Sequence, residues 1–283
     1  MQEFLDIAVE AAREAGGILL AEMDRPRQIS YKGEGSTDLV TQADQRSEAA
    51  IVARLRSLFP QHLIVAEEGS GDAPAAQGSR EGVARYRWYV DPLDGTTNFA
   101  HGYPCFAVSI GLAEVDSDGH EELLCGVVFN PVSGELFTAM RGEGAYLNQK
   151  RIRVSNIHTL SASLLATGFP QQKRTESPNI NYYWRFTLAS HGVRRDGSAA
   201  LDLCAVACGR FEGFWEFGLK PWDTAAGLLM VREAGGMVTG MNGKPYAMGG
   251  REILASNGQV HAEMQLLAAD IAERAPFPPA VPR

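Results

Sequence analysis

The sequence contains few cysteines and no excess of basic residues. Cys105, Cys125, Cys204 and Cys208 are the only cysteines among 283 residues, and their spacing matches neither a secreted disulfide framework nor a CxxC zinc site. We therefore expect them to be reduced, small core residues. Lysine and arginine number 26 against 34 aspartates and glutamates, which gives a formal charge of −8. This balance argues against a dedicated nucleic-acid binder, because such proteins neutralise phosphates with basic side chains.

Long hydrophobic runs are also absent. No apolar run reaches the roughly 18 to 20 residues that cross a bilayer, and Met1 to Asp6 carries acids where a signal peptide carries bases. The sequence thus predicts a cytoplasmic protein with no membrane partner. The hydrophobic content of 45% is too high for a disordered chain. The 30 glycines exceed the usual share of roughly 7% and predict many tight turns or close backbone approaches.

Hydrophobic periodicity predicts an α+β half followed by an α/β half. Helices are expected over residues 2–23 and about 42–59, the second ending before Pro60. Short strands are expected at 63–66, 86–90, 107–113, 123–129 and 135–140. Their spacing suggests a largely antiparallel sheet. Later in the chain the predicted elements alternate: strands at 164–167, 214–217 and 253–256, with helices near 199–208, at 222–234 and from 261.

The change of pattern suggests two halves and a tail. We assign residues 1–150 to the first half, 151–275 to the second, and 276–283 to a flexible tail, because this proline-rich end cannot continue a helix. Residues 69–85 are rich in glycine, alanine, serine and charge, which predicts an exposed excursion that could form a mobile flap beside a site.

Two aspartates at the end of a predicted strand are the first candidates for chemistry. Asp91 and Asp94 follow the strand at 86–90, and Pro92 keeps Asp91 extended. The residues 96–98 can open a helix whose free N–H groups attract an anion. Two carboxylates beside such a helix start favour Mg²⁺, which prefers oxygen ligands and often binds a substrate phosphate as well. The alternative is a hairpin turn at Asp94-Gly95 followed by a helix cap.

Two other acidic segments also lie at the end of a predicted strand or at the start of a predicted helix. Glu67-Glu68 follows the apolar run at 63–66, and Trp222-Asp223 opens a predicted helix. Taken alone, the first is more typical of a solvated pair and the second of a partner for the helix dipole. Together with Asp91 and Asp94 they favour a common metal site.

The combined pattern resembles the inositol monophosphatase superfamily, a group of magnesium-dependent, lithium-sensitive phosphatases. The matching residues are Asp44, Glu67-Glu68, Asp91-Pro92-Leu93-Asp94-Gly95-Thr96 and Trp222-Asp223, all present and in order. The resemblance also takes in residues 32–44 and 222–236, so it spans nearly the whole chain except the flap and tail. It implies a layered αβαβα sandwich and a homodimer.

The resemblance also implies a set of metal ligands and catalytic residues. Glu67, Asp91 and the backbone carbonyl of Leu93 would hold one Mg²⁺ ion. Asp91, Asp94 and Asp223 would hold a second, and a third, looser ion would bind through Glu67 and water. Thr96, paired with Asp44, would orient the attacking water, while the amides of Gly95 and Thr96 bind the phosphate. Lys32 and Glu68 are further candidates at this site.

Substrate contacts follow from the same resemblance. The turn Gly197-Ser198-Ala199, Glu216 and Asp223 match the positions that contact the substrate alcohol. A carboxylate such as Glu216 suits a polyol because it can accept two hydroxyl protons, and the alternative to this interpretation is an exposed acid on a strand. The expected substrate is a small phosphate monoester, foremost inositol 1-phosphate. Histidinol phosphate, fructose 1,6-bisphosphate and adenosine bisphosphate are alternatives, and a role as a binding partner of the transcription machinery is the non-enzymatic one.

Overall fold

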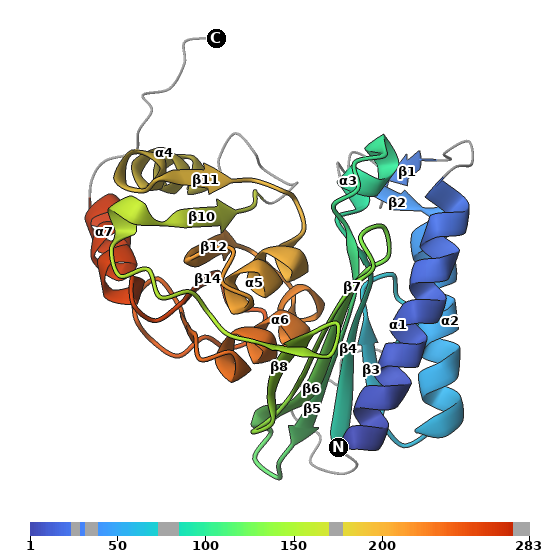
Figure 1. Ribbon diagram of the computed structural model, residues 1–283. Coiled ribbons are helices and arrows are strands. Elements are labelled where there is room, and N and C mark those ends of the chain that lie inside the picture. The colour runs from blue at the N-terminus through green and yellow to red at the C-terminus, as the bar shows by residue number, and fades with distance from the viewer. Residues whose placement is uncertain (24–28, 32–38, 73–84, 170–177, 274–283) are drawn as a thin grey trace.

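Two β-sheets alternate with three layers of helices (Figure 1). A computed structural model describes residues 1–23, 29–31, 39–72, 85–169 and 178–273. The order of the layers in space differs from the order of the elements along the chain, because the middle helices come from the second half of the sequence. The arrangement confirms the predicted layered αβαβα sandwich.

The larger sheet has seven strands in the order β3-β4-β5-β6-β7-β8-β9. Its strands are β3 (Leu63–Ala66), β4 (Tyr86–Asp94), β5 (Ala107–Val115), β6 (Glu121–Asn130), β7 (Glu135–Met140), β8 (Gly144–Leu147) and β9 (Lys150–Ile152). Only β3 and β4 pair in parallel, and the other neighbours are antiparallel, as predicted.

The smaller sheet has five strands in the order β11-β10-β12-β14-β13. Its strands are β10 (Leu164–Thr167), β11 (Gly192–Arg194), β12 (Gly213–Phe217), β13 (Met237–Thr239) and β14 (Glu252–Ser256). Strand β10 is parallel to both neighbours, and the remaining pairs are antiparallel. A 3-10 turn, η1 (Leu160–Ala162), precedes β10, and β1 (Ile29–Tyr31) pairs with β2 (Leu39–Thr41) in a separate two-stranded sheet.

Helices α1 (Gln2–Met23) and α2 (Gln42–Leu58) cover the outer face of the larger sheet (Figure 1). Both were predicted within one residue of these bounds. The buried face of α1 recurs at helical spacing and consists of Leu5, Ala8, Ala11, Ala12, Ala15, Gly16 and Leu19. Its small side chains allow the helix to lie close to the sheet.

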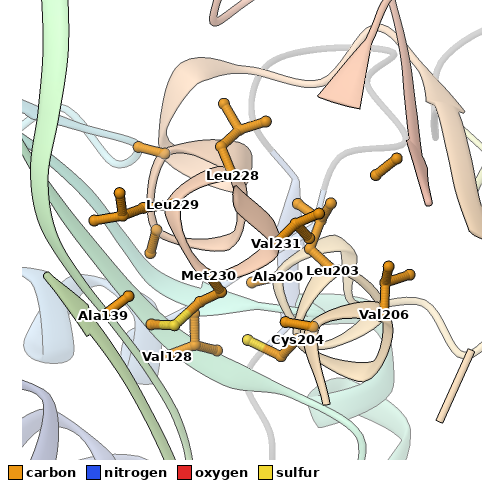
Figure 2. Packing of buried hydrophobic residues seen from close by; sticks show 14 of the residues in the cluster. Val128, Ala139, Ala200, Leu203, Cys204, Val206, Leu228, Leu229, Met230 and Val231 are labelled. Carbon is orange, nitrogen blue, oxygen red and sulfur yellow. The ribbon is translucent and has the colours of Figure 1, made fainter. Parts of the chain in front are cut away.

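Helices α5 (Ala199–Ala207) and α6 (Pro221–Glu233) form the middle layer, between the two sheets. Both are apolar on nearly all sides, as expected for helices covered on two faces. Figure 2 shows Leu228 to Val231 of α6 packed among Leu203 and Cys204 of α5 and Val128 of β6. This shared core joins the two sheets through the layer that carries several candidate site residues.

Helices α4 (Asn179–Ala189) and α7 (His261–Glu273) cover the outer face of the smaller sheet, where Phe186 stacks on Trp215.

No helix in the described ranges is both long and apolar enough to span a bilayer. The predicted tail and most of the predicted flap lie outside the described residues. The division near residue 150 stays a prediction; the larger sheet ends at Ile152 and the smaller one begins at Leu164.

All four cysteines lie in described segments and none forms a disulfide. Cys125 and Cys204 are buried as predicted. The prediction is wrong for Cys105 and Cys208, which are only partly buried. Cys105 lies in the loop after α3 (Thr96–His101), and Cys208 ends α5, so neither is enclosed on every side.

Candidate active site

Most of the predicted site residues line one cavity of ≈ 450 Å³. Its walls come from both halves of the chain. They include Glu67, Asp91, Leu93, Asp94, Gly95, Thr96, Gly197, Ala199, Glu216 and Asp223. Asp44, Glu68 and Ser198 are not part of the wall, and Lys32 lies outside the described residues.

Strand β4 carries both aspartates to the cavity. The strand continues to Asp94, past the predicted end at residue 90, and its register against β5 shifts between Asp91 and Asp94. Pro92 cannot donate a hydrogen bond to the ladder, which accounts for an irregularity at this point. Asp91 is only 2% exposed, and its Oδ1 accepts a hydrogen bond from the Leu93 N–H at 2.9 Å. Gly95 then turns the chain into α3 with a left-handed φ of 99°.

Asp94 is held by hydrogen bonds from residues of the second half of the chain. Its Oδ2 accepts a hydrogen bond from the Ser198 hydroxyl and another, of 2.7 Å, from the Ala200 N–H. Ser198 is the N-cap of α5, so the start of a middle-layer helix fixes an aspartate of the larger sheet. Ser198, predicted as a substrate contact, thus has a positioning contact that the sequence did not reveal.

Thr96 and Asp44 are paired, as the resemblance implied. The Thr96 hydroxyl lies 3.3 Å from Asp44 Oδ1 and 3.2 Å from the Leu93 carbonyl oxygen. Asp44 is fully buried in the first turn of α2. Thr96 is therefore part of the cavity wall, and Asp44 contacts it from outside the lining residues.

Asp223 lies in the first turn of α6, where the sequence placed it. Its Oδ2 accepts a hydrogen bond of 2.7 Å from the Lys220 N–H, and Pro221 occupies the start of the helix. This capping contact uses one carboxylate oxygen and fixes the side chain at the cavity.

Glu216 lies on β12 and is only 8% exposed, so the alternative of an exposed strand acid is wrong. Its carboxylate rests against the backbone of Gly168, where an added Cβ would stand 2.3 Å from either carboxylate oxygen. Glycine at 168 therefore makes room for the glutamate in the cavity wall.

Comparison with known proteins identifies this arrangement. A model of the inositol monophosphatase family matches residues 1–274. The chain belongs to the inositol monophosphatase family. It is 44% identical to the inositol-1-monophosphatase of Synechocystis over 275 residues, which are 95% of this chain and 90% of that protein. It is 45% identical to the Nus factor SuhB of Pseudomonas aeruginosa over 260 residues, 91% of this chain and 92% of that one.

Solved structures give the same result. The inositol monophosphatase of Anabaena superposes with a TM-score of 0.81 at 42% identity, covering 95% of this chain and 96% of that chain. Family membership supports phosphatase activity on a small-molecule phosphate, and the family uses metal ions.

The cavity concentrates negative charge. Burial, with Glu67 and Asp94 nearby, raises the pKa of Asp91 well above its ordinary value. Burial raises the pKa of Asp94 to about 6, although the Ser198 and Ala200 hydrogen bonds oppose the shift. Burial and Asp94 raise the pKa of Asp223, and burial and Asp223 raise that of Glu216. Deprotonating these groups together requires a compensating cation.

The donor set suits a hard divalent cation. Carboxylate oxygens and the Leu93 carbonyl are the ligands that Mg²⁺ prefers. Across the described ranges, no three His, Cys, Asp or Glu side chains converge tightly enough to hold an ion as they stand. Asp94 and Asp223 instead direct one oxygen each to hydrogen-bond donors of the chain. Their chemistry fits a metal, and these side chains would have to reorient to hold one.

The sequence reasoning missed several residues at the cavity. Arg195, Phe169 and Lys220 line the wall. Arg195 is exposed, and its positive charge opposes the rise in the pKa values of Asp202 and Glu216. Asn98 was seen only as part of a helix start, but its amide donates to the Cys105 and Asp196 carbonyls at 2.6 and 2.7 Å. The one sequence signal that could have placed Arg195 at the site was its position next to the Asp196-Gly197 turn.

Proposed function

We propose that this chain is a Mg²⁺-dependent phosphomonoesterase that hydrolyses a small polyol phosphate, inositol 1-phosphate foremost. The observation that carries the proposal is the gathering of Glu67, Asp91, Asp94 and Asp223 around one cavity, with Glu216 in the same wall. The Synechocystis relative, named an inositol-1-monophosphatase, supports the choice of substrate. Sensitivity to lithium, a homodimer and a cytoplasmic location belong to the same proposal.

Five residues would hold the metal ions. Glu67, Asp91 and the Leu93 carbonyl would bind one ion, and Asp91, Asp94 and Asp223 a second, with a third held loosely through Glu67. Bound Mg²⁺ supplies Lewis acidity at the phosphate and lowers the pKa of a coordinated water. Two or three ions would also offset the carboxylate charge that burial makes costly.

Thr96 and Asp44 would set the direction of attack. The buried Asp44 carboxylate accepts the hydrogen bond of the Thr96 hydroxyl, and because Thr96 lines the cavity, the lone pairs of Thr96 Oγ1 would be available there. Those lone pairs can accept a hydrogen bond from the attacking water and so orient it toward phosphorus. The amides of Gly95 and Thr96 line the same wall and would donate to the phosphate oxygens.

The leaving alcohol would lie toward the second half of the chain. Glu216 presents two acceptor oxygens to the hydroxyl groups of a polyol, beside Gly197 and Ala199. Ser198 contributes by holding Asp94 in place. Small residues in this turn leave room for a ring substrate.

The proposal is tested by phosphate release from a substrate panel with and without Mg²⁺. We expect inositol 1-phosphate to be turned over only with Mg²⁺, and millimolar Li⁺ to inhibit.

Asp94→Asn should lower kcat by about 10³-fold or more, because it removes a ligand charge. Asp118→Asn in an exposed turn is the matched control and should leave kcat unchanged. A large preference in kcat/KM for histidinol phosphate would overturn the polyol assignment.

A second substrate class is favoured by Arg195. An exposed guanidinium in the wall of an acid-rich cavity suits a second anionic group on the substrate. Fructose 1,6-bisphosphate and adenosine bisphosphate carry such a group. Arg195→Gln would then reduce kcat/KM for the bisphosphate tenfold or more and spare inositol 1-phosphate. Equal effects on both substrates would remove this candidate.

A role in transcription is the other candidate, favoured by the relative named Nus factor SuhB. Asp94→Asn separates the two roles, because it should stop hydrolysis and leave a macromolecular interaction intact. If Asp94→Asn retained binding to a transcription complex, both functions would coexist in the chain. Absence of such binding in the unmodified protein would leave the phosphatase alone.

A further inference from the structure

Helix α2 has a buried polar face that points toward the site. Asp44, Ser47 and Glu48 are each 0% exposed, although they lie on a helix whose other buried residues are mostly apolar. Their spacing of three and four residues places them on one side of the helix. Buried polar side chains are retained only where they find partners. The partners here are three different segments that carry candidate site residues.

Each of these three side chains contacts a different segment. Asp44 accepts from Thr96 at the start of α3, and the Ser47 hydroxyl donates to the Pro92 carbonyl oxygen at 2.9 Å. Pro92 stands between Asp91 and Asp94, so Ser47 supports the irregular end of β4 from behind. The third side chain, Glu48, reaches the loop that follows β3.

Glu48 uses both of its carboxylate oxygens on that loop. Oε2 accepts from the Glu68 N–H at 2.6 Å. Oε1 accepts from the Ser70 N–H at 2.8 Å and from the Ser70 hydroxyl at 2.6 Å. Glu67 itself donates its N–H to the Val90 carbonyl oxygen at 3.2 Å, so its backbone is fixed on both sides.

We propose that Glu48, with Ser47, is a positioning residue that sets the affinity of the site for its divalent cation. Glu48 holds the backbone beside Glu67, and Ser47 holds the backbone between Asp91 and Asp94, so one helix fixes the segments that carry these carboxylates. Preorganised ligands bind a metal more tightly because less ordering remains to be done on binding. The inference rests on the proposed Mg²⁺ dependence and names residues outside the ligand set.

Calorimetric titration of Mg²⁺ into the full-length, substrate-free protein tests this inference. In Glu48→Gln, one amide NH₂ must face a backbone N–H of Glu68 or Ser70, so one anchor of the loop is lost. We expect the Kd for Mg²⁺ to rise about 10- to 100-fold. The kcat at saturating Mg²⁺ should fall much less than the affinity. Ser47→Ala should shift Kd in the same direction by a smaller factor.

Ile51→Val is the matched control, since Ile51 is buried on the same helix and belongs to the apolar core. If Ile51→Val weakened Mg²⁺ binding as much as Glu48→Gln, a general loosening of α2 would replace the positioning role. Equal Kd values for the unmodified protein and Glu48→Gln would overturn the inference while leaving the proposed function standing. Failure of the unmodified protein to bind Mg²⁺ would instead overturn the proposed function. Should Glu48→Gln not fold, Ser47→Ala and Glu48→Asp carry the same comparison.

Discussion

At the scale of single residues, the contact between Gly168 and Glu216 is unusually specific. A methyl group at residue 168 would come within 2.3 Å of the Glu216 carboxylate oxygens, so the glutamate would have to move. We expect Gly168→Ala to lower kcat/KM for a polyol phosphate tenfold or more, mainly by raising KM. Steady-state kinetics with inositol 1-phosphate measures this effect.

Gly17→Ala is the control for that substitution. Residue 17 lies in α1, and an added Cβ there meets nothing within 4 Å. It should leave kcat/KM unchanged and stabilise the helix by about 0.5–1 kcal/mol. A normal KM in Gly168→Ala would mean that Glu216 takes no part in substrate binding.

The carboxylates of the site could be predicted from sequence, whereas their supports could not. Asp91 and Asp94 share a motif, and Asp223 opens a recognisable helix, so each is visible in a short window. Glu48 and Ser198 act through contacts with residues 20 and 104 positions away. Side chains of that kind have no local pattern, and only the tertiary structure identifies their partners.

At the scale of elements, α6 lies so close to the larger sheet that a strand facing it has room only for glycine at the point of contact. A Cβ on Gly126 of β6 would lie 2.9 Å from the Ala226 Cα, which is backbone and cannot rotate away. We expect Gly126→Ala to destabilise the fold by about 1–3 kcal/mol through overpacking. Urea unfolding measures this, and activity should fall as well because α6 carries Asp223.

Gly192→Ala provides the comparison for that variant. Its added Cβ would meet the end of the Arg194 side chain at 3.4 Å and Leu164 Cδ1 at 3.7 Å, both ordinary contact distances. We expect its unfolding free energy to stay within about 0.5 kcal/mol of the unmodified value. Equal stability of Gly126→Ala and the unmodified protein would show that the middle layer can shift without cost.

Elements with a clear apolar period were predicted well, and short or irregular ones were not. Helices α1, α2 and α7 have long periodic segments, and β7 was predicted with its observed bounds. Helix α4 was missed because its aromatic and asparagine residues favour a helix only weakly. Strands β9, β11 and β13 have three residues each, too few for a pattern, and are formed by pairing with neighbours.

At the scale of the whole molecule, metal binding and stability are linked. The cavity gathers buried carboxylates whose pKa values burial raises, so the folded chain pays for their ionisation until a cation is present. We expect Mg²⁺ at about 100 times its Kd to stabilise the protein by about 2.7 kcal/mol and to raise Tm by several degrees. Thermal unfolding with Mg²⁺, against NaCl of equal ionic strength, measures this. The same Tm in both salts would contradict a built-in cation site.

Acid should weaken the fold through His261. This residue is 3% exposed, between the Ser256 hydroxyl at 2.8 Å and the Thr239 hydroxyl at 2.9 Å. Burial lowers its pKa below the ordinary 6.5, so below that pH the unfolded chain binds a proton that the folded chain does not. The stability that His261 contributes should therefore be lost as pH falls through 6.5, by at most about 1.4 kcal/mol per pH unit, while the cavity carboxylates with raised pKa values act in the opposite direction.

Urea unfolding at pH 7.5 and 5.5 checks this sign. His261→Gln removes the titrating group, so its loss of stability on acidification should be smaller than that of the unmodified protein. Identical pH slopes for the two proteins would show that His261 is protonated to the same extent in both states.

The hydrogen bonds from Ser198 and Ala200 to Asp94 also bear on how the protein matures. They join residues 104 and 106 positions apart, so the aspartate acquires its supports only after the second half has been synthesised and has docked on the first. Contacts of such long sequence separation form late in folding, because a large loop must close first. An emerging or partly folded chain would thus be inert toward metabolites. We therefore expect catalytic activity only in molecules in which both halves have folded and docked.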